Sequence, residues 1–243
     1  MAEIASPAVV ETQGLGRRYG RRWALAHLDL CVKGGECLLV VGANGSGKTT
    51  LLRILATGLL PSTGSLRLFG EPATTAAGAV RVRPRIALLS HQLGLYEDLS
   101  AAQNLEILAG LGGRPALVDA WLDEVGLERR PDPVRTYSAG MRKRLGFARL
   151  LAQSPRLALI DEPYGQLDPE GFRTTEILME RLRTQGVTLI VASHLVERAS
   201  RWADRALLLD QGMPRWTGPA RDISSAWTQL HTGTRKTSAA RPS

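Results

Sequence analysis

A glycine-rich stretch near the start of the chain lies between a strand-like run and a helix-like run. Apolar residues fill positions 37–41, and leucine and isoleucine recur at helical spacing over 51–55. Between them the sequence matches the pattern Gly, four free positions, then Gly-Lys-Ser/Thr. The stretch consists of Gly42, Ala43, Asn44, Gly45, Ser46, Gly47, Lys48, Thr49 and Thr50. A strand, a glycine loop and a helix in this order predict an α/β fold with a phosphate-binding loop.

The chemistry of this loop suits phosphate. Backbone N–H groups at a helix N-terminus point at a ligand there, and the helix dipole favours negative charge. Lys48 is expected to reach the β- and γ-phosphates of a nucleotide, and the Thr49 hydroxyl is expected to bind Mg²⁺. The alternative is a chance glycine-rich turn, and the flanking strand and helix patterns argue against it.

The composition is that of a soluble globular protein, with 44% apolar and 22% charged residues in a chain of 243. No apolar run approaches the ~20 residues of a membrane-spanning helix. Residues 1–10 lack the charged start and long apolar core of a secretory signal. The formal net charge of +8 permits contact with nucleic acid or an anionic membrane. We favour arginine-rich solvated faces as its cause, so no nucleic-acid partner is expected.

The order of patterns predicts a mostly parallel core sheet, an antiparallel β subdomain and a helical insertion. Residues 23–32 alternate apolar and polar side chains, which is typical of a half-buried antiparallel strand. Residues 157–160 are continuously apolar and 187–192 nearly so, as in strands covered on both faces. Helical spacing dominates the middle of the chain, so the insertion is placed at about residues 93–153.

A single domain is predicted over residues 1–218. Within it, residues 71–84 are rich in Ala, Gly and Arg and are expected to form a loose connection. Residues 219–243 are polar and are expected to form a loosely ordered tail.

Two acidic residues, Asp161 and Glu162, directly follow the apolar run at 157–160. Carboxylates at the tip of a buried strand are costly unless they face a cation or a reacting centre. Asp161 is expected to hold the Mg²⁺ shell together with Thr49. Glu162 is expected to polarise the water that attacks the γ-phosphate, a role worth ~10²–10⁴-fold in rate. A turn-capping acid pair would explain either residue alone, but it explains both poorly beside a phosphate loop.

A serine and small residues open a second helix-like run, an arrangement that suits a bound phosphate. This stretch resembles the signature motif of the ATP-binding-cassette ATPases, usually Leu-Ser-Gly-Gly-Gln. Ser138 and Gly140 match that motif. Three positions depart from it: Tyr137, Ala139 and Met141. The resemblance implies that four residues here bind nucleotide: Ser138, Ala139, Gly140 and Met141.

The other elements of this family follow in order over about residues 8–218. The resemblance implies that Tyr19 stacks on adenine, that Gln92 contacts Mg²⁺ and the lytic water, and that His194 contacts the γ-phosphate. Residues 167–168 match the end of the family's D-loop. A lone histidine at a strand end is more often structural, but the accompanying motifs favour the functional interpretation.

The resemblance also implies the cofactors and the partners. ATP and Mg²⁺ would bind between two copies of the chain, because the signature of one copy completes the site of the other. Separate membrane-spanning subunits would dock near residues 92–100, which places the chain at the cytoplasmic face of the inner membrane.

Several stretches resemble one subfamily, the ATP-binding subunit of the haem exporter used in cytochrome c biogenesis. They are residues 90–92, 95–100, 134–141 and 161–164. An ATPase subunit of a multidrug, polysaccharide or lipid exporter is the alternative.

Two further classes remain open. A cassette protein that acts on ribosomes or DNA without transport usually carries two cassettes or a long coiled coil, and neither pattern is present. A phosphate-loop kinase needs no hydrolytic base, so the signature and the acidic pair argue against it.

Overall fold

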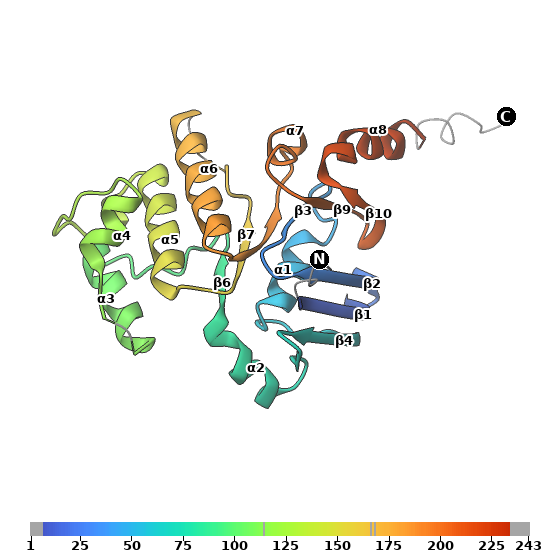
Figure 1. The fold of residues 1–243 in the computed structure, drawn as a ribbon, viewed down its shortest axis with the longest axis horizontal. Helices are drawn as coiled ribbons and strands as arrows, with labels where there is room; N and C mark the ends of the chain where they lie inside the picture. Colours follow the sequence, from blue (N-terminus) through green and yellow to red (C-terminus); the bar gives the residue numbers. More distant parts are fainter. Residues whose placement is uncertain (1–6, 114, 166, 168, 234–243) are drawn as a thin grey trace, which may run out of the picture.

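The computed structural model describes residues 7–113, 115–165, 167 and 169–233. They form two sheets with surrounding helices (Figure 1). The strands are β1 (Ala8–Tyr19), β2 (Arg22–Lys33), β3 (Cys37–Val41), β4 (Thr63–Leu68), β5 (Glu71–Pro72), β6 (Ile86–Leu89), β7 (Leu157–Asp161), β8 (Thr188–Ala192), β9 (Arg205–Asp210) and β10 (Met213–Pro219). The helices are α1 (Lys48–Leu55), α2 (Ala76–Val82), α3 (Ala101–Leu111), α4 (Val118–Glu124), α5 (Ala139–Gln153), α6 (Pro169–Thr184), α7 (Val196–Ala199) and α8 (Ile223–Gly233). Short 3₁₀ helices cover Arg83–Arg85, Val134–Thr136 and Ala220–Asp222.

A six-stranded sheet forms the core, in the order β10-β9-β3-β8-β7-β6. Its strands are parallel from β9 to β6, and β10 pairs antiparallel at one edge. Every residue of β3, β7 and β8 is buried. Along β3, Leu39 and Val41 belong to the same apolar cluster as α5, whereas Leu38 and Val40 belong to the cluster of α1 and the second sheet. The continuous apolar runs therefore reflect strands with a core on each face.

The second sheet has four antiparallel strands in the order β2-β1-β4-β5. Burial alternates along much of β2, as expected for a sheet with one solvated face. Its buried side chains, such as Leu28 and Leu30, pack in one cluster with Leu51 and Ile54 of α1. The two sheets and the helices between them confirm the predicted α/β class.

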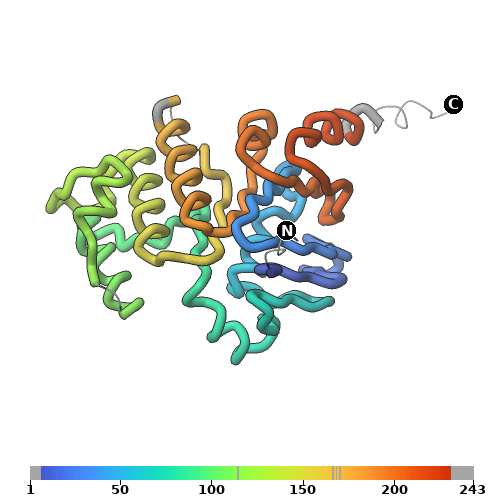
Figure 2. Tube along the Cα trace, in the orientation of Figure 1, coloured from blue at the N-terminus to red at the C-terminus, as the bar shows by residue number. Residues whose placement is uncertain are grey.

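Helices α3, α4 and α5 come between β6 and β7 in the chain and stand together to one side of the core (Figures 1 and 2). In the trace of Figure 2 this segment runs from green to yellow, on the opposite side from β1 and β2. Ser100 begins α3 with a capping box that includes Gln103. Asn104 holds the preceding loop, accepting from the Tyr96 amide (2.7 Å) and donating to the Tyr96 carbonyl (3.0 Å). The bounds of this segment as a subdomain stay a prediction.

The expectation of a loose connection at residues 71–84 is wrong. The segment contains β5, α2 and a 3₁₀ helix. Thr75 caps α2 by accepting from the Gly78 amide (3.1 Å), and Val82 is fully buried. Short elements with small residues lack the long periodic pattern that reveals a helix in a sequence.

The expectation of a loosely ordered tail from residue 219 is wrong over its first part, where α8 forms. Ala220 and Ile223 are buried, and Ala226, Trp227 and Leu230 pack against the core. The apolar residues from Ile223 to Leu230 recur at helical spacing, a signal that the polar composition of the segment obscures. Residues 234–243 of the predicted tail lie outside the described residues.

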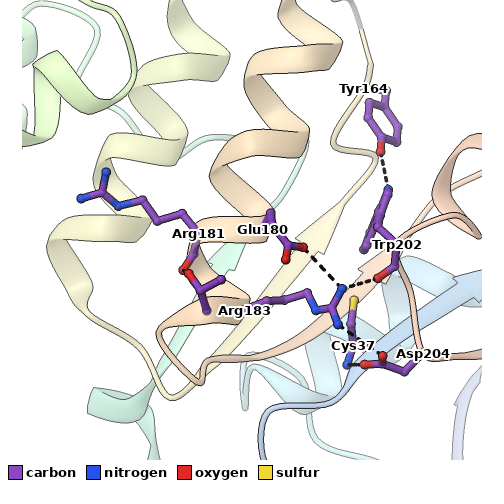
Figure 3. A network of polar contacts seen from close by, with 8 residues as sticks. Cys37, Tyr164, Glu180, Arg181, Arg183, Trp202 and Asp204 are labelled. Atoms are coloured by element: carbon purple, nitrogen blue, oxygen red, sulfur yellow. Dashed lines mark hydrogen bonds and ion pairs between the residues drawn. The ribbon is translucent and has the colours of Figure 1, made fainter.

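A polar network joins the end of α6 to the starts of β3 and β9 (Figure 3). Arg183 donates to the Trp202 carbonyl (2.7 Å) and to the Asp204 carboxylate (3.3 Å). Asp204 also accepts from the Cys37 amide (2.8 Å). Trp202 Nε1 donates to the hydroxyl of the buried Tyr164 (2.9 Å). Because Tyr164 follows the acidic pair closely in the chain, the network anchors the loop after that pair.

Candidate nucleotide site

Four neighbouring strand ends bring the predicted groups to one edge of the core sheet. The phosphate loop follows β3, His194 follows β8, the acidic pair lies at the end of β7, and Gln92 follows β6. These strands are adjacent and parallel, so their carboxyl ends meet where open α/β sheets bind ligands. Residues from all four strand ends line one open cleft of about 660 Å³.

The phosphate loop turns sharply into α1 at Gly47. This residue has φ of 110°, and a Cβ atom there would lie 2.4 Å from the Ala24 carbonyl oxygen. Both the conformation and the close approach require glycine. The backbone therefore begins α1 at Lys48, and residues 47–50 at the N-terminus of the helix line a groove.

The Lys48 ammonium lies inside the curve of the loop. Its Nζ donates to the carbonyls of Gly42 (2.7 Å) and Ala43 (3.2 Å), and the residue is only 6% exposed. Burial lowers the pKa of Lys48, while the carboxylates of Glu162 and Asp161 oppose that shift. A phosphate entering the loop would meet a cation that has already lost most of its water.

Thr49 and Asp161 join the first turn of α1 to the end of β7. The Thr49 hydroxyl donates to Asp161 Oδ2 at 2.7 Å, and Asp161 is buried. A hydroxyl and a carboxylate are oxygen ligands of the kind that Mg²⁺ prefers. Within the described residues no three His, Cys, Asp or Glu side chains cluster as a metal site. A hydroxyl next to one carboxylate fits Mg²⁺, an ion that commonly takes its other ligands from phosphate and water oxygens.

Glu162 and His194 face each other across the ends of β7 and β8. Glu162 Oε2 lies 2.8 Å from His194 Nδ1 and accepts a longer bond from the His194 amide (3.4 Å). Glu162 has φ of 49°, in the left-handed region that favours glycine. Its own amide donates to the Ala192 carbonyl of β8 (2.9 Å). The backbone thus turns sharply at Glu162 and presents its carboxylate to the histidine.

Gln92 and Tyr19 lie at two different walls of the site. Gln92 is exposed and lines the 660 Å³ cleft together with Asp161 and Glu162. Tyr19, at the end of β1, lines a second groove of about 530 Å³ with the phosphate loop. The guanidinium of Arg17 lies 4.9 Å from the centre of the Tyr19 ring, a cation–π contact that helps to orient the ring.

The signature stretch begins α5, and only part of it lines the grooves beside the phosphate loop. Ser138 caps α5, accepting from the Met141 amide at 3.2 Å. Ala139 lines the 660 Å³ cleft, which Asn44 of the phosphate loop also lines. Ser138, Gly140 and Met141 are not among the described residues that line either groove. Gln166 and Asp168, which belong to the predicted D-loop, lie outside the described residues.

Lys143 is absent from the residues predicted from the sequence, yet it lies at the site. It is 8% exposed, and its Nζ donates to the Glu162 carbonyl at 2.9 Å. Burial lowers the pKa of Lys143 to about 8, against the opposing carboxylates of Asp161 and Glu162. Its spacing from Gly146 and Leu150, three and seven residues on, would have placed it on the buried stripe of the helix.

This fold and site define a class. A parallel sheet with a phosphate loop at its edge, an adjacent Thr–Asp pair and an open cleft is the architecture of the phosphate-loop nucleotide-binding proteins. The profile of the ABC transporter family matches residues 25–165, and the chain belongs to this family.

Relatives within the family carry names that refer to different molecules. The chain is 35% identical over 218 residues to the Nod factor export ATP-binding protein I of Ralstonia nicotianae, across 86% of this chain and 66% of that protein. It is 36% identical over 222 residues to the daunorubicin resistance ATP-binding protein DrrA3 of Streptomyces coeruleorubidus, across 89% and 70%. The chain thus spans about two thirds of the length of these relatives.

The fold also matches solved structures. A bacterial ABC transporter cassette described as dimeric, MJ0796, is 25% identical and superposes with a TM-score of 0.80, across 87% of this chain and 99% of that one.

None of the helices in the described part of this chain is long and apolar enough to cross a bilayer.

Proposed function

We propose that the chain is the ATP-hydrolysing subunit of a transporter and that two copies close around two ATP molecules. The observation that carries this proposal is the contact between Glu162 and His194, at the same sheet edge as Lys48 and the Thr49–Asp161 pair. A binding site alone needs a cation and loop amides. Hydrolysis also requires a carboxylate near the bound phosphate to activate water, and Glu162, held by His194, is such a carboxylate.

Each side chain has a distinct role in the proposed reaction. Lys48 neutralises the β- and γ-phosphates, and bound Mg²⁺ would supply further charge neutralisation through Thr49 and Asp161. Glu162 orients the attacking water and accepts its proton. His194 holds the Glu162 carboxylate in place through the 2.8 Å contact. Gln92 lies across the cleft, where it would sense whether the γ-phosphate and the water are present.

The position of Ser138 supports pairing of two copies. Ser138 begins α5, whose N-terminal amides favour an anion. Ser138 lines neither groove beside its own phosphate loop, so we assign it to the nucleotide of a second copy. The dimeric state of the superposed cassette supports this assignment.

We predict that Ser138→Arg leaves ATP binding by the monomer intact but blocks ATP-driven dimerisation. The new side chain fills the space of the partner's phosphate, while loss of the helix cap costs only about 1 kcal/mol. Sedimentation in a Glu162→Gln background measures the dimer, and Ser65→Arg on the exposed part of β4 is the matched control. A normal ATP-bound dimer of Ser138→Arg would remove the signature from the composite site.

The membrane-spanning subunits would dock on the cleft between Gln92 and α5. Its walls include Leu93, Leu95 and Val134, and Tyr96 beside it is 56% exposed. Apolar side chains within a largely polar cleft, with an exposed aromatic residue beside them, suit a helix inserted from a partner. This docking would hold the chain at the cytoplasmic face of the inner membrane.

For the cargo we propose haem, with other exported molecules as the alternative. The support is the resemblance of residues 90–92, 95–100, 134–141 and 161–164 to haem-exporter subunits. The two relatives described above carry names for other cargo, so this proposal stands on those stretches alone.

We expect the chain to co-purify from its own membranes with the membrane subunits of a haem exporter. Mass spectrometry of the complex identifies them, and the Ser138→Arg variant, which keeps the docking cleft, is the control for partner capture. Membrane subunits of a multidrug, polysaccharide or lipid exporter in their place would contradict haem as the cargo and leave the ATPase proposal standing.

A further inference from the structure

One face of α5 contacts both loops that flank the cleft. Lys143, Gly146 and Arg149 follow at intervals of three residues, so they lie along one side of the helix. Lys143 Nζ donates to the Glu162 carbonyl (2.9 Å), and Arg149 donates to the carbonyl of Leu93 (2.7 Å). The helix thus holds the loop after β7 and the loop after β6 at the same time.

The contact is close because the helix has a glycine at its centre. A Cβ atom at Gly146 would lie 2.7 Å from Leu89 Cδ1 and 3.0 Å from Leu93 Cδ2. A larger residue would force the ends of the Leu89 and Leu93 side chains to shift. The glycine therefore lets α5 pack closely against the residues that precede and follow the end of β6.

Burial of the Lys143 side chain costs free energy that a role in packing alone does not explain. The side chain is 8% exposed, and a buried ammonium loses hydration that one neutral carbonyl restores only in part. Its acceptor is the carbonyl of the residue whose backbone is left-handed, Glu162 with φ of 49°. The Gly165 amide donates to the same carbonyl at 3.2 Å. Lys143 and Gly165 together hold the peptide after Glu162 in the orientation that directs the carboxylate toward His194.

We propose that Lys143 is a positioning residue: it holds Glu162 in its reactive orientation and links it through α5 to the signature at Ser138. The proposal rests on the proposed ATPase function. Ser138 and Lys143 are separated by a rise of only about 7.5 Å along the axis of α5. Displacement of Ser138 by the nucleotide of a second copy would therefore move the support of this chain's own Glu162. Each ATP site would then sense the occupancy of the other.

The experiment compares Lys143→Met with Arg144→Met in the full-length chain. Arg144 is a matched control because it also donates to a backbone carbonyl from α5, that of Gly126 at 2.7 Å, but away from the cleft. ATP affinity, kcat and the Hill coefficient of hydrolysis are measured for both variants and the parent. ATP affinity equal to that of the parent shows that a variant is folded. Lys143→Gln, with a shorter neutral side chain, is a second test of the contact between Lys143 and the Glu162 carbonyl.

We expect Lys143→Met to bind ATP as the parent does, to lose ~10–100-fold in kcat because Glu162 is misplaced, and to hydrolyse ATP without cooperativity. Lys143→Gln should also have a lower kcat than the parent. Arg144→Met should keep the kcat and the Hill coefficient of the parent. An unchanged kcat in both Lys143 variants would overturn the positioning role. A parent without cooperativity would overturn the link between sites. Loss of hydrolysis in Glu162→Gln tests the ATPase function separately. Failure of the positioning role of Lys143 would therefore not imply failure of the ATPase proposal.

Discussion

Glu162→Gln is expected to slow ATP hydrolysis by ~10²-fold or more while ATP still binds, because the variant keeps the shape of the side chain and loses the proton acceptor. In the structure the carboxylate already lies 2.8 Å from His194 Nδ1 and stands beside the buried Asp161. The amide of glutamine can retain the contact to His194, so the geometry of the site should persist.

Single-turnover hydrolysis and equilibrium ATP binding measure the two quantities, and sedimentation should show an ATP-bound dimer that persists. Glu71→Gln is the matched control, because Glu71 also contacts a nitrogen-bearing side chain, Arg81 at 3.2 Å, on strand β5 of the other sheet. A turnover rate within a few-fold of the parent would exclude Glu162 as the base and move that role to another group in the cleft.

Lys48→Ala is expected to weaken ATP binding by ~10²-fold, since a charge-assisted bond to phosphate contributes about 1.5–3 kcal/mol and the lysine makes more than one. Lys48 is buried within the loop and held by the carbonyls of Gly42 and Ala43. An ammonium has three N–H donors, so at least one remains for a phosphate while Lys48 keeps these two contacts.

Isothermal titration of ATP with each variant measures this effect. Lys33→Ala is the control, because Lys33 is an exposed lysine at the end of β2 and its loss changes the net charge equally. ATP affinity equal to that of the parent would contradict the assignment of the loop at Gly42 to Thr50 as the phosphate site.

Local patterns were enough to predict the parts of the site whose chemistry lies within a few consecutive residues. The phosphate loop and the acidic pair each combine a strand pattern with adjacent polar groups. Continuous apolar runs on β3 and β7 indicated parallel strands, and parallel neighbours bring their carboxyl ends together. The proximity of Thr49 and Asp161, which are 112 residues apart, follows from this rule.

Contacts between distant segments could not be predicted in the same way. The sequence predicted roles for Glu162 and His194 toward a phosphate, but it did not predict their contact with each other across 32 residues. Lys143 looked like one of several cations in a basic helix, and although its spacing matches the buried stripe, only the structure shows that it contacts the Glu162 carbonyl. The helices α2 and α8 depend on Val82 and Ile223 finding the core, which composition alone does not reveal.

The sequence by itself determined the class of fold, the phosphate loop and the residue types at the strand ends, because short patterns of apolar and glycine residues specify them. The tertiary structure decided which of these side chains meet. Side-chain partners are selected by the close packing of helices on a twisted sheet, and that packing sums many weak contacts that no local pattern encodes. Such packing places α5 so that Ser138 caps its N-terminus while Lys143, on the same helix, contacts the Glu162 carbonyl.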